Sequence, residues 1–198
     1  MMTSAGTTTV AVMGFDGVVL AGGDARRLSG LDKATIEVGG LALLERALGA
    51  VQGAERVIAV GPRRSASIPV QWTSEVPAGG GPLRATIAGL EFVSSEVAVV
   101  LAVDYPFVTY EVVASLLSAA QGHDGAALED TAGQMHYVVG AYRANALRAA
   151  VAERNSDELS MHSLFTTLDV ASLRNDLAAQ DIDTPEDLDR ARAHWSGA

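Results

Sequence analysis

Cysteine is absent from this chain of 198 residues, and its absence removes several classes of function. Disulfide scaffolds, zinc sites with thiolate ligands and cysteine nucleophiles all require the missing residue. The sequence also lacks any run close to the roughly 20 apolar residues that a membrane-spanning helix needs. Its N-terminus lacks the basic start of a secretory signal. We therefore expect a soluble, cytoplasmic protein.

Positive charge is scarce, since 14 Lys and Arg stand against 24 Asp and Glu and the formal net charge is −10. Such a balance argues against a nucleic-acid partner or an anionic membrane surface. It does not exclude a small phosphate ligand, which responds to local charge, and Arg26, Arg27 and Lys33 stand close together. With 48% hydrophobic and 19% charged residues, the chain can bury a sizeable core.

Short apolar runs alternate with longer segments of helical period along the whole chain. The predicted strands are 17–21, 35–38, 56–60, 68–72, 97–103, 125–128, 136–142 and 170–173, and the predicted helices are 43–51, 82–93, 110–120, 145–153, 161–168 and 185–194. This alternation predicts one α/β domain, residues 15–198 after a loose extension 1–14, with a mostly parallel (mixed) sheet. The uniformly apolar run 97–103 predicts a central strand, buried on both faces.

A glycine-rich loop follows the first predicted strand, in GVVLAGGDARRLSGLDK, residues 17–33. It is not the dinucleotide-binding fingerprint, because Gly22 and Gly23 are adjacent and Gly30 comes seven residues after Gly23. It is not a P-loop either, because Leu31-Asp32 separates Gly30 from Lys33 and an alanine follows the lysine. For a lone glycine pair, a flexible turn with solvated arginines would be the favoured explanation.

The combination of features favours a phosphate-binding loop. Glycine lets backbone N–H groups approach phosphates closely, and three cations follow within a few residues in an otherwise acidic chain. Charge-assisted contacts to a triphosphate need such cations.

Four segments of the sequence, in order, carry recognisable motifs. The loop resembles L-A-G-G-x-x-x-R-[ML]-x-G-x-D-K, and residues 81–90 resemble a G-P-L…G-L segment. Residues 104–107 resemble a D-x-P-F element, and residues 181–188 resemble a closing N-x-N-T-P-E-D-L. In this sequence the loop motif is carried by Leu20-Ala21-Gly22-Gly23, Arg27-Leu28, Gly30 and Asp32-Lys33. Together the four motifs resemble those of the molybdenum cofactor guanylyltransferases, and the resemblance covers about residues 17–190.

The resemblance implies a Rossmann-like three-layer sandwich of the nucleotide-diphosphosugar transferase type. It implies Mg²⁺-dependent transfer of GMP from GTP to the terminal phosphate of molybdenum-bound molybdopterin, with release of pyrophosphate. It also implies transient contact with molybdoenzymes or other proteins of cofactor biosynthesis. The nucleotide would be contacted by the backbone of Leu20, Ala21, Gly22 and Gly23.

Nucleotidyl transfer requires aligned substrates and neutralised phosphate charge, so cations carry the predicted catalysis. Lys33 is the first candidate to reach the phosphates, and Arg27 is the second, unless it pairs with Asp32. Asp104 directly follows the apolar strand, at the carboxyl end where open α/β sheets bind ligands. A carboxylate there is costly unless it is paired or holds a metal, so Asp104 is predicted to bind Mg²⁺ and the nucleotide. Asp181 and Asp183 are candidates for a second carboxylate ligand, Asp183 first, or for contact with the acceptor; capping of the last helix is the alternative for Asp183.

Base recognition has one candidate, Glu75, whose carboxylate could accept both donors of guanine; a solvated loop glutamate is the alternative. His136 falls in a segment that lines the acceptor side in the resembling family, but a hydrogen-bonded strand histidine is favoured. Gly61 stands where some members of that family have an asparagine that touches the nucleotide. Asp181 and Asp183 replace asparagines of the closing motif.

Three alternatives stay open. A sister nucleotidyltransferase would share the loop and the metal site but use another base or acceptor. Examples are a CTP-dependent molybdopterin cytidylyltransferase and a guanylyltransferase for a phospholactate-type substrate. A non-catalytic cofactor-delivery protein is disfavoured, because carriage needs no metal carboxylate. A dinucleotide-dependent oxidoreductase is disfavoured by the failed fingerprint.

Overall fold

The computed structural model describes residues 14–22, 24–25, 31–76, 79–153 and 160–196. Its centre is a seven-stranded sheet in the order β11-β9-β10-β8-β1-β6-β7. Of these strands only β10 runs antiparallel to its neighbours. The strands are β1 (Phe15–Leu20), β6 (Arg56–Val60), β7 (Gln71–Thr73), β8 (Val97–Ala102), β9 (Gly125–Glu129), β10 (Met135–Arg143) and β11 (Val170–Arg174).

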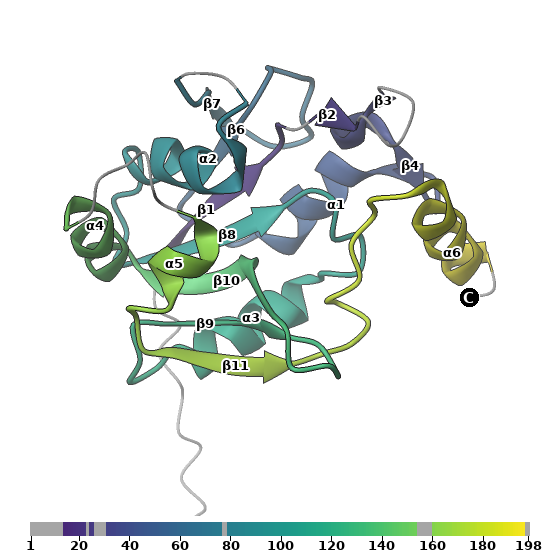
Figure 1. Cartoon of the computed structure of the whole chain (residues 1–198). Helices are drawn as coiled ribbons and strands as arrows, with labels where there is room; N and C mark the ends of the chain where they lie inside the picture. Colours follow the sequence, from purple (N-terminus) through teal and green to yellow (C-terminus); the bar gives the residue numbers. More distant parts are fainter. Residues whose placement is uncertain (1–13, 23, 26–30, 77–78, 154–159, 197–198) are drawn as a thin grey trace, which may run out of the picture.

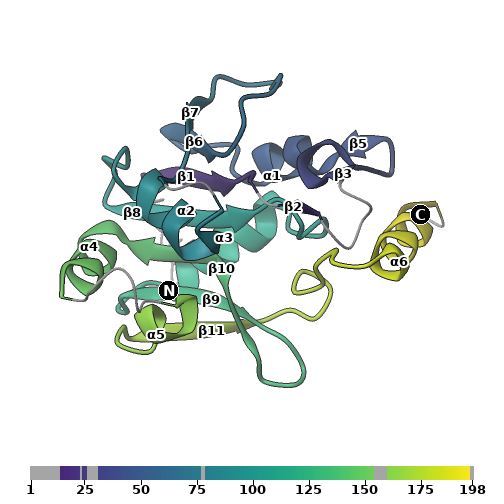
Figure 2. The same cartoon turned by 45° about the horizontal axis from the view of Figure 1, so that its top comes forward.

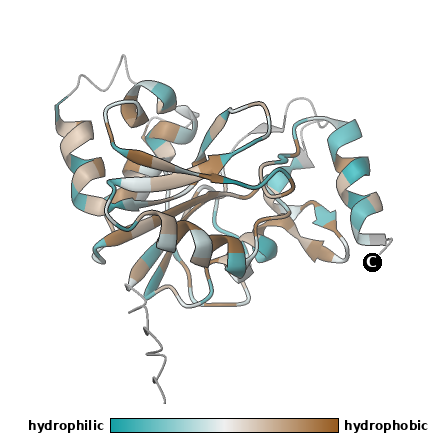
Figure 3. Cartoon of the chain, turned by 90° about the horizontal axis from the view of Figure 1, so that it is seen from below, coloured by the Kyte–Doolittle hydropathy of each residue, from teal (hydrophilic) through white to brown (hydrophobic). Residues whose placement is uncertain are grey.

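Helices cover both faces of this sheet, which gives three layers (Figure 1). One face carries α1 (Leu43–Ala50) and α3 (Tyr110–Ala119), and the other carries α2 (Gly81–Leu90), α4 (Ala144–Ala152) and α5 (Met161–Phe165). Side chains alternate along each strand, so Val99 and Leu101 of β8 pack with the first group while Val100 packs with the second. Apolar residues accordingly concentrate on the strands and polar ones on outer helix faces (Figure 3).

The predicted mixed, mostly parallel α/β sandwich is confirmed by this sheet. The strand predicted at 56–60 matches β6, and the run 97–103 matches β8, which pairs with β1 and β10 at the centre. The proposed division into an extension 1–14 and a domain stays a prediction, because residues 1–13 lie outside the described residues. Among the helices of the described residues, none has the length and apolarity needed to cross a membrane.

Two strand predictions were wrong in detail. The run 35–38 splits into a 3₁₀ turn (Lys33–Thr35) and β4 (Glu37–Val38), which forms a hairpin with β5 (Leu41–Ala42). The turn of this hairpin places Gly39 and Gly40 at φ 58° and 75°, a region that glycine enters without strain. The run 68–72 yields strand structure only from Gln71, in the edge strand β7.

The C-terminal helix α6 (Pro185–Ser196) packs beside the β4–β5 hairpin (Figure 2). The Arg46 guanidinium lies 3.9 Å from the centre of the Trp195 ring, and its Nε donates to the Val38 carbonyl at 3.0 Å. A cation over an indole face is an attractive contact, so Arg46 joins the helix to the hairpin. The segment before α6 is thereby brought next to the turn that carries Lys33.

Candidate active site

The carboxyl ends of β1 and β8 meet at one edge of the sheet. The two strands are parallel, and the pairing continues beyond them because Val103 N donates to Leu20 O at 3.2 Å. Ala21 and Gly22 therefore leave the sheet next to Asp104. In Figure 1 this edge faces β2 (Asp24–Ala25), β3 (Leu31–Asp32) and α6. The same edge binds ligands in open α/β folds.

Lys33 joins three segments at this edge. Its Nζ lies 3.1 Å from Asp104 Oδ2, just after β8, and 2.6 Å from Asp183 Oδ1, just before α6. Burial alone would lower the pKa of Lys33, but the charge of Asp104 and the hydrogen bonds with both carboxylates outweigh it, so the pKa is raised. Lys33 therefore stays protonated at the carboxyl edge of the sheet. It is the only lysine in the sequence.

Asp104 offers a second oxygen that this lysine does not use. Asp104 Oδ1 is buried and has no hydrogen-bond partner among the described residues. Asp104 does not cap the helix that follows it, because the Thr109 hydroxyl accepts from Val112 N at the start of α3. A buried carboxylate oxygen without a hydrogen-bond donor destabilises the fold. A bound cation or a donor group of a ligand would satisfy Asp104 Oδ1.

Asp183 does not cap α6, because its neighbour does. Thr184 Oγ1 accepts from Asp187 N at 3.2 Å, and Asp187 Oδ2 accepts from the backbone N of Asp183 and Thr184. This reciprocal arrangement is a capping box, and it leaves the Asp183 side chain facing Lys33. Burial raises the pKa of Asp181, and the nearby charges of Asp183 and Asp104 raise it further. The site therefore gathers three carboxylates around one amine.

These residues fit a magnesium ion bound jointly with phosphates. Mg²⁺ keeps several waters and usually takes only one or two carboxylates in addition to substrate oxygens. Asp104 and Asp183 converge on the Lys33 ammonium, and Asp104 Oδ1 is unpaired within the described part of the chain. The described residues contain no group of three or more His, Cys, Asp or Glu arranged to hold a metal. A metal here would rely on ligand and water oxygens for the rest of its coordination.

The backbones of Gly22 and Gly61 meet on the other side of β1. Gly61 has φ 141°, and a Cβ on it would lie 2.6 Å from Gly22 N. Its own N donates to Thr73 O at 2.8 Å. An asparagine, as expected at this position in some relatives, would clash in this conformation. The chain therefore presents backbone, rather than a side chain, at this point.

Glu75 lies between β7 and α2 and is half-buried. Its Oε1 accepts from Gly79 N at 3.1 Å, so the carboxylate folds back onto its own loop. Gly79 and Gly81 have φ 78° and 80°, which turns the chain sharply into α2. The structure brings Glu75 no contact with Lys33 or Asp104, and its role in base recognition stays a prediction.

His136 is hydrogen-bonded within the fold, as the favoured interpretation expects. Its Nδ1 lies 3.0 Å from the Tyr105 hydroxyl and its Nε2 lies 3.5 Å from Asp130 Oδ2. Burial raises the pKa of Tyr105 above its ordinary value, and the charges of Asp104, Asp181 and Asp183 raise it further. The tyrosine is therefore neutral beside the carboxylates.

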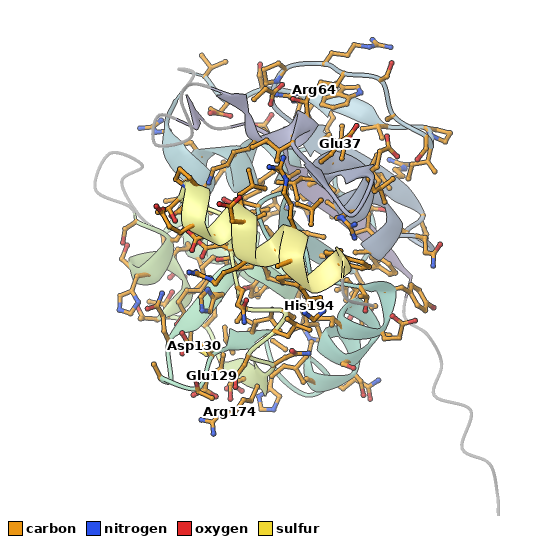
Figure 4. All side chains as sticks on the ribbon, turned by 90° about the vertical axis from the view of Figure 1, so that its right-hand side faces the viewer. Glu37, Arg64, Glu129, Asp130, Arg174 and His194 are labelled. Atoms are coloured by element: carbon orange, nitrogen blue, oxygen red, sulfur yellow. The ribbon has the colours of Figure 1, made fainter. Side chains whose placement is uncertain are left out.

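Two predicted residues, Arg27 and Gly23, lie outside the described residues. Sequence reasoning missed Arg64, which follows β6 and forms a two-pronged ion pair with Asp32 at 2.6 and 2.7 Å. Figure 4 looks onto this edge, with α6 crossing in front of the sheet and Arg64 above it. The sequence did offer one signal for Arg64: it comes shortly after the predicted strand 56–60. In the fold, the end of this strand lies beside the end of β1.

The sheet and the charged edge are those of a nucleotidyltransferase. The chain belongs to the MobA-like NTP transferase domain family, whose model matches residues 17–172. The resemblance noted in the sequence is thereby confirmed.

Curated relatives agree over most of the chain. A probable molybdenum cofactor guanylyltransferase of Natronomonas pharaonis is 28% identical over 91% of this chain and 98% of its own length. A protein of the same name from Mycobacterium ulcerans is 32% identical over 85% of this chain and 92% of its own length.

Two solved structures share the fold. One is molybdopterin-guanine dinucleotide biosynthesis protein A from Archaeoglobus fulgidus, with TM-score 0.73 and 21% identity over 92% of this chain and all of that one. The other is 2-C-methyl-D-erythritol 4-phosphate cytidylyltransferase from Thermus thermophilus, with TM-score 0.74 and 23% identity over 93% of this chain and all of that one. At these identities the likeness concerns the fold alone.

Proposed function

We propose that this chain is a molybdenum cofactor guanylyltransferase, which transfers GMP from GTP to the terminal phosphate of molybdenum-bound molybdopterin. Support comes from the relatives of that name, which align along most of the chain. The observation that carries the proposal is the Lys33 amine held between Asp104 and Asp183 at the carboxyl edge of the sheet. We further propose that the reaction takes place in the cytoplasm and that the product passes to molybdoenzymes by transient contact.

The proposed reaction is a single displacement at the α-phosphorus of GTP. An oxygen of the acceptor phosphate forms a bond to that phosphorus, and the bond to the β-phosphate oxygen breaks. Pyrophosphate leaves with the electron pair of the broken bond. Because both reactants are anions, catalysis depends on position and on neutralisation of charge. Lys33 supplies a fixed ammonium to the phosphates, and Arg27 is the second proposed cation.

Mg²⁺ is the proposed cofactor, with Asp104 as its first ligand and Asp183 as its second. When bound, it supplies positive charge to the α-phosphate and to the leaving pyrophosphate. Asp104 could serve it through Oδ1, which has no partner among the described residues, while Oδ2 remains with Lys33. Lys33 then orients the same carboxylate that holds the metal.

Base selection is proposed for the backbone of Leu20, Ala21, Gly22 and Gly23 and for the carboxylate of Glu75. Guanine presents a ring N–H and an exocyclic amine, and a carboxylate accepts two such donors side by side. For this contact Glu75 would exchange its hydrogen bond with Gly79 N for the base. Cytosine lacks the matching pair of donors, so Glu75 would favour guanine over cytosine.

Titration calorimetry with GTP, CTP and ATP, each with Mg²⁺, tests the nucleotide assignment. We expect GTP to bind and the other two to bind far more weakly. Preferential binding of CTP would replace the proposal with a cytidylyltransferase.

The variant Asp104→Ala tests the assignment of Asp104 as a metal ligand. It should abolish Mg²⁺-dependent turnover while the circular dichroism spectrum stays unchanged. A fully active variant would remove Asp104 from the metal site.

A further inference from the structure

Arg64 lies in the loop after β6 and was not singled out by any sequence motif. Its guanidinium donates from Nε and Nη2 to the two oxygens of Asp32 at 2.6 and 2.7 Å. Its Nη1 donates to Ala21 O at 3.0 Å and to Pro62 O at 2.7 Å. Four N–H groups of the guanidinium thus donate to acceptors on three residues, Asp32, Ala21 and Pro62. Only 14% of the Arg64 side chain is exposed, against 41% of the Asp32 side chain, so the guanidinium is mostly buried while its carboxylate partner reaches solvent.

Asp32 connects the Arg64 guanidinium to the turn that begins at Lys33. Its Oδ1 also accepts from Ala34 N at 3.2 Å, and it is the N-terminal cap of the 3₁₀ turn Lys33–Thr35. Thr35 Oγ1 donates to Asp32 O at 2.9 Å and closes the same turn. Two-pronged arginine–carboxylate pairs fix orientation as well as distance. The start of the lysine turn therefore has its position set by the guanidinium of Arg64.

Ala21, the other partner of Arg64, belongs to the backbone proposed to contact the base and ribose. Ala21 has independent support, because its N donates to Val60 O at 2.9 Å. The far end of the lysine turn is also held, since Leu43 N donates to Ile36 O at 2.9 Å. The end of the turn at Asp32 depends on Arg64 most directly.

We infer that Arg64 is a positioning residue that sets the distance between the base-contacting backbone at Ala21 and the phosphate-contacting amine of Lys33. This inference rests on the proposed nucleotide function. Arg64 touches neither substrate; it acts through Asp32. Without it, the Lys33 turn must be ordered by the incoming triphosphate, so part of the binding free energy is lost to ordering.

The test compares Arg64→Met with Arg63→Met in the full-length chain. Arg63 is the exposed neighbour with the same charge, so the control variant holds the change in net charge constant. Affinities for GTP, GDP and guanosine are measured by ligand-observed NMR competition with Mg²⁺ present. Asp32→Asn is a second variant, which removes the ionic half of the pair and leaves Arg64 its two carbonyl partners.

Arg64→Met should bind GTP and GDP about tenfold more weakly or worse, a loss of about 1.4 kcal/mol, while its affinity for guanosine stays unchanged. Asp32→Asn should change the affinities in the same direction, and Arg63→Met should match the wild type. An equal loss for all three ligands would assign Arg64 to the fold as a whole, and unchanged GTP binding would remove its role. If the wild type binds none of the three, the nucleotide function itself fails, and the inference fails with it.

Discussion

Lys33→Met removes the amine that joins the 3₁₀ turn to Asp104 and Asp183 while it keeps most of the apolar stem. A charge-assisted hydrogen bond contributes about 1.5–3 kcal/mol when its surroundings are dry. Here the Asp104 and Asp183 side chains are 23% and 50% exposed, so solvent screens the pairs and we expect a net loss of about 1 kcal/mol. In a chain of this size that loss lowers Tm by about 2–4 °C.

The assay is thermal unfolding of wild type, Lys33→Met and Arg56→Met, each with and without Mg²⁺. Arg56 is exposed at the start of β6, so its variant controls for the loss of one positive charge. Without the amine, Asp104 and Asp183 repel each other, and Mg²⁺ should restore most of the lost Tm in Lys33→Met. Transfer of GMP should still fall by about 100-fold or more, because the fixed cation at the phosphates is gone.

The pH dependence of this stabilisation follows from the raised pKa of Lys33. A group whose pKa is raised on folding stabilises the fold fully below its ordinary value, here 10.5, and the effect is lost as pH rises through the raised value. The Tm difference between wild type and Lys33→Met should therefore be constant through neutral pH. A variant with wild-type Tm and no added response to Mg²⁺ would refute the paired site.

Three further outcomes follow from particular residues. Gly61→Asn should lower Tm and weaken GTP binding, because its Cβ would lie 2.6 Å from a facing backbone nitrogen at φ 141°; unchanged calorimetry would contradict this. Gly89→Val should cost about 1–3 kcal/mol in urea unfolding, since even a Cβ would approach a β1 valine methyl to 2.4 Å. Burial alone would raise the pKa of Asp16, but hydrogen bonds from Ser94 and Ser95 outweigh it and lower the pKa. Its contribution is therefore present above pH 3.8 and lost as pH falls through the lowered pKa, so Asp16→Asn should destabilise at neutral pH and flatten the acid-unfolding curve.

The layers of the fold could be predicted because they depend on local hydrophobic period. The uniform run 97–103 requires cover on two faces, and the structure provides it with helices on both sides of β8. The short elements could not be predicted in the same way. Residues 33–38 divide between a turn and a hairpin strand because of Asp32 capping and two glycines at positive φ, which are effects of single residues.

At the site, the sequence indicated Lys33 through its place in the glycine-rich loop and Asp104 through its place directly after a predicted strand. It could not say that Asp183 turns towards the lysine, because that depends on Thr184 taking the cap of α6. Sequence reasoning did not single out Arg64, because its partners Asp32 and Ala21 are distant in sequence. Contacts of this kind arise only when the ends of β1 and β6 are brought together.

The most direct test of the account is product analysis by mass spectrometry after incubation with Mg²⁺, molybdenum-bound molybdopterin and one nucleoside triphosphate at a time. With GTP we expect the guanine dinucleotide of the cofactor and one pyrophosphate for each GMP transferred, and with CTP or ATP we expect neither. Formation of the cytosine dinucleotide from CTP, or no transfer from bound GTP, would contradict the proposed guanylyltransferase.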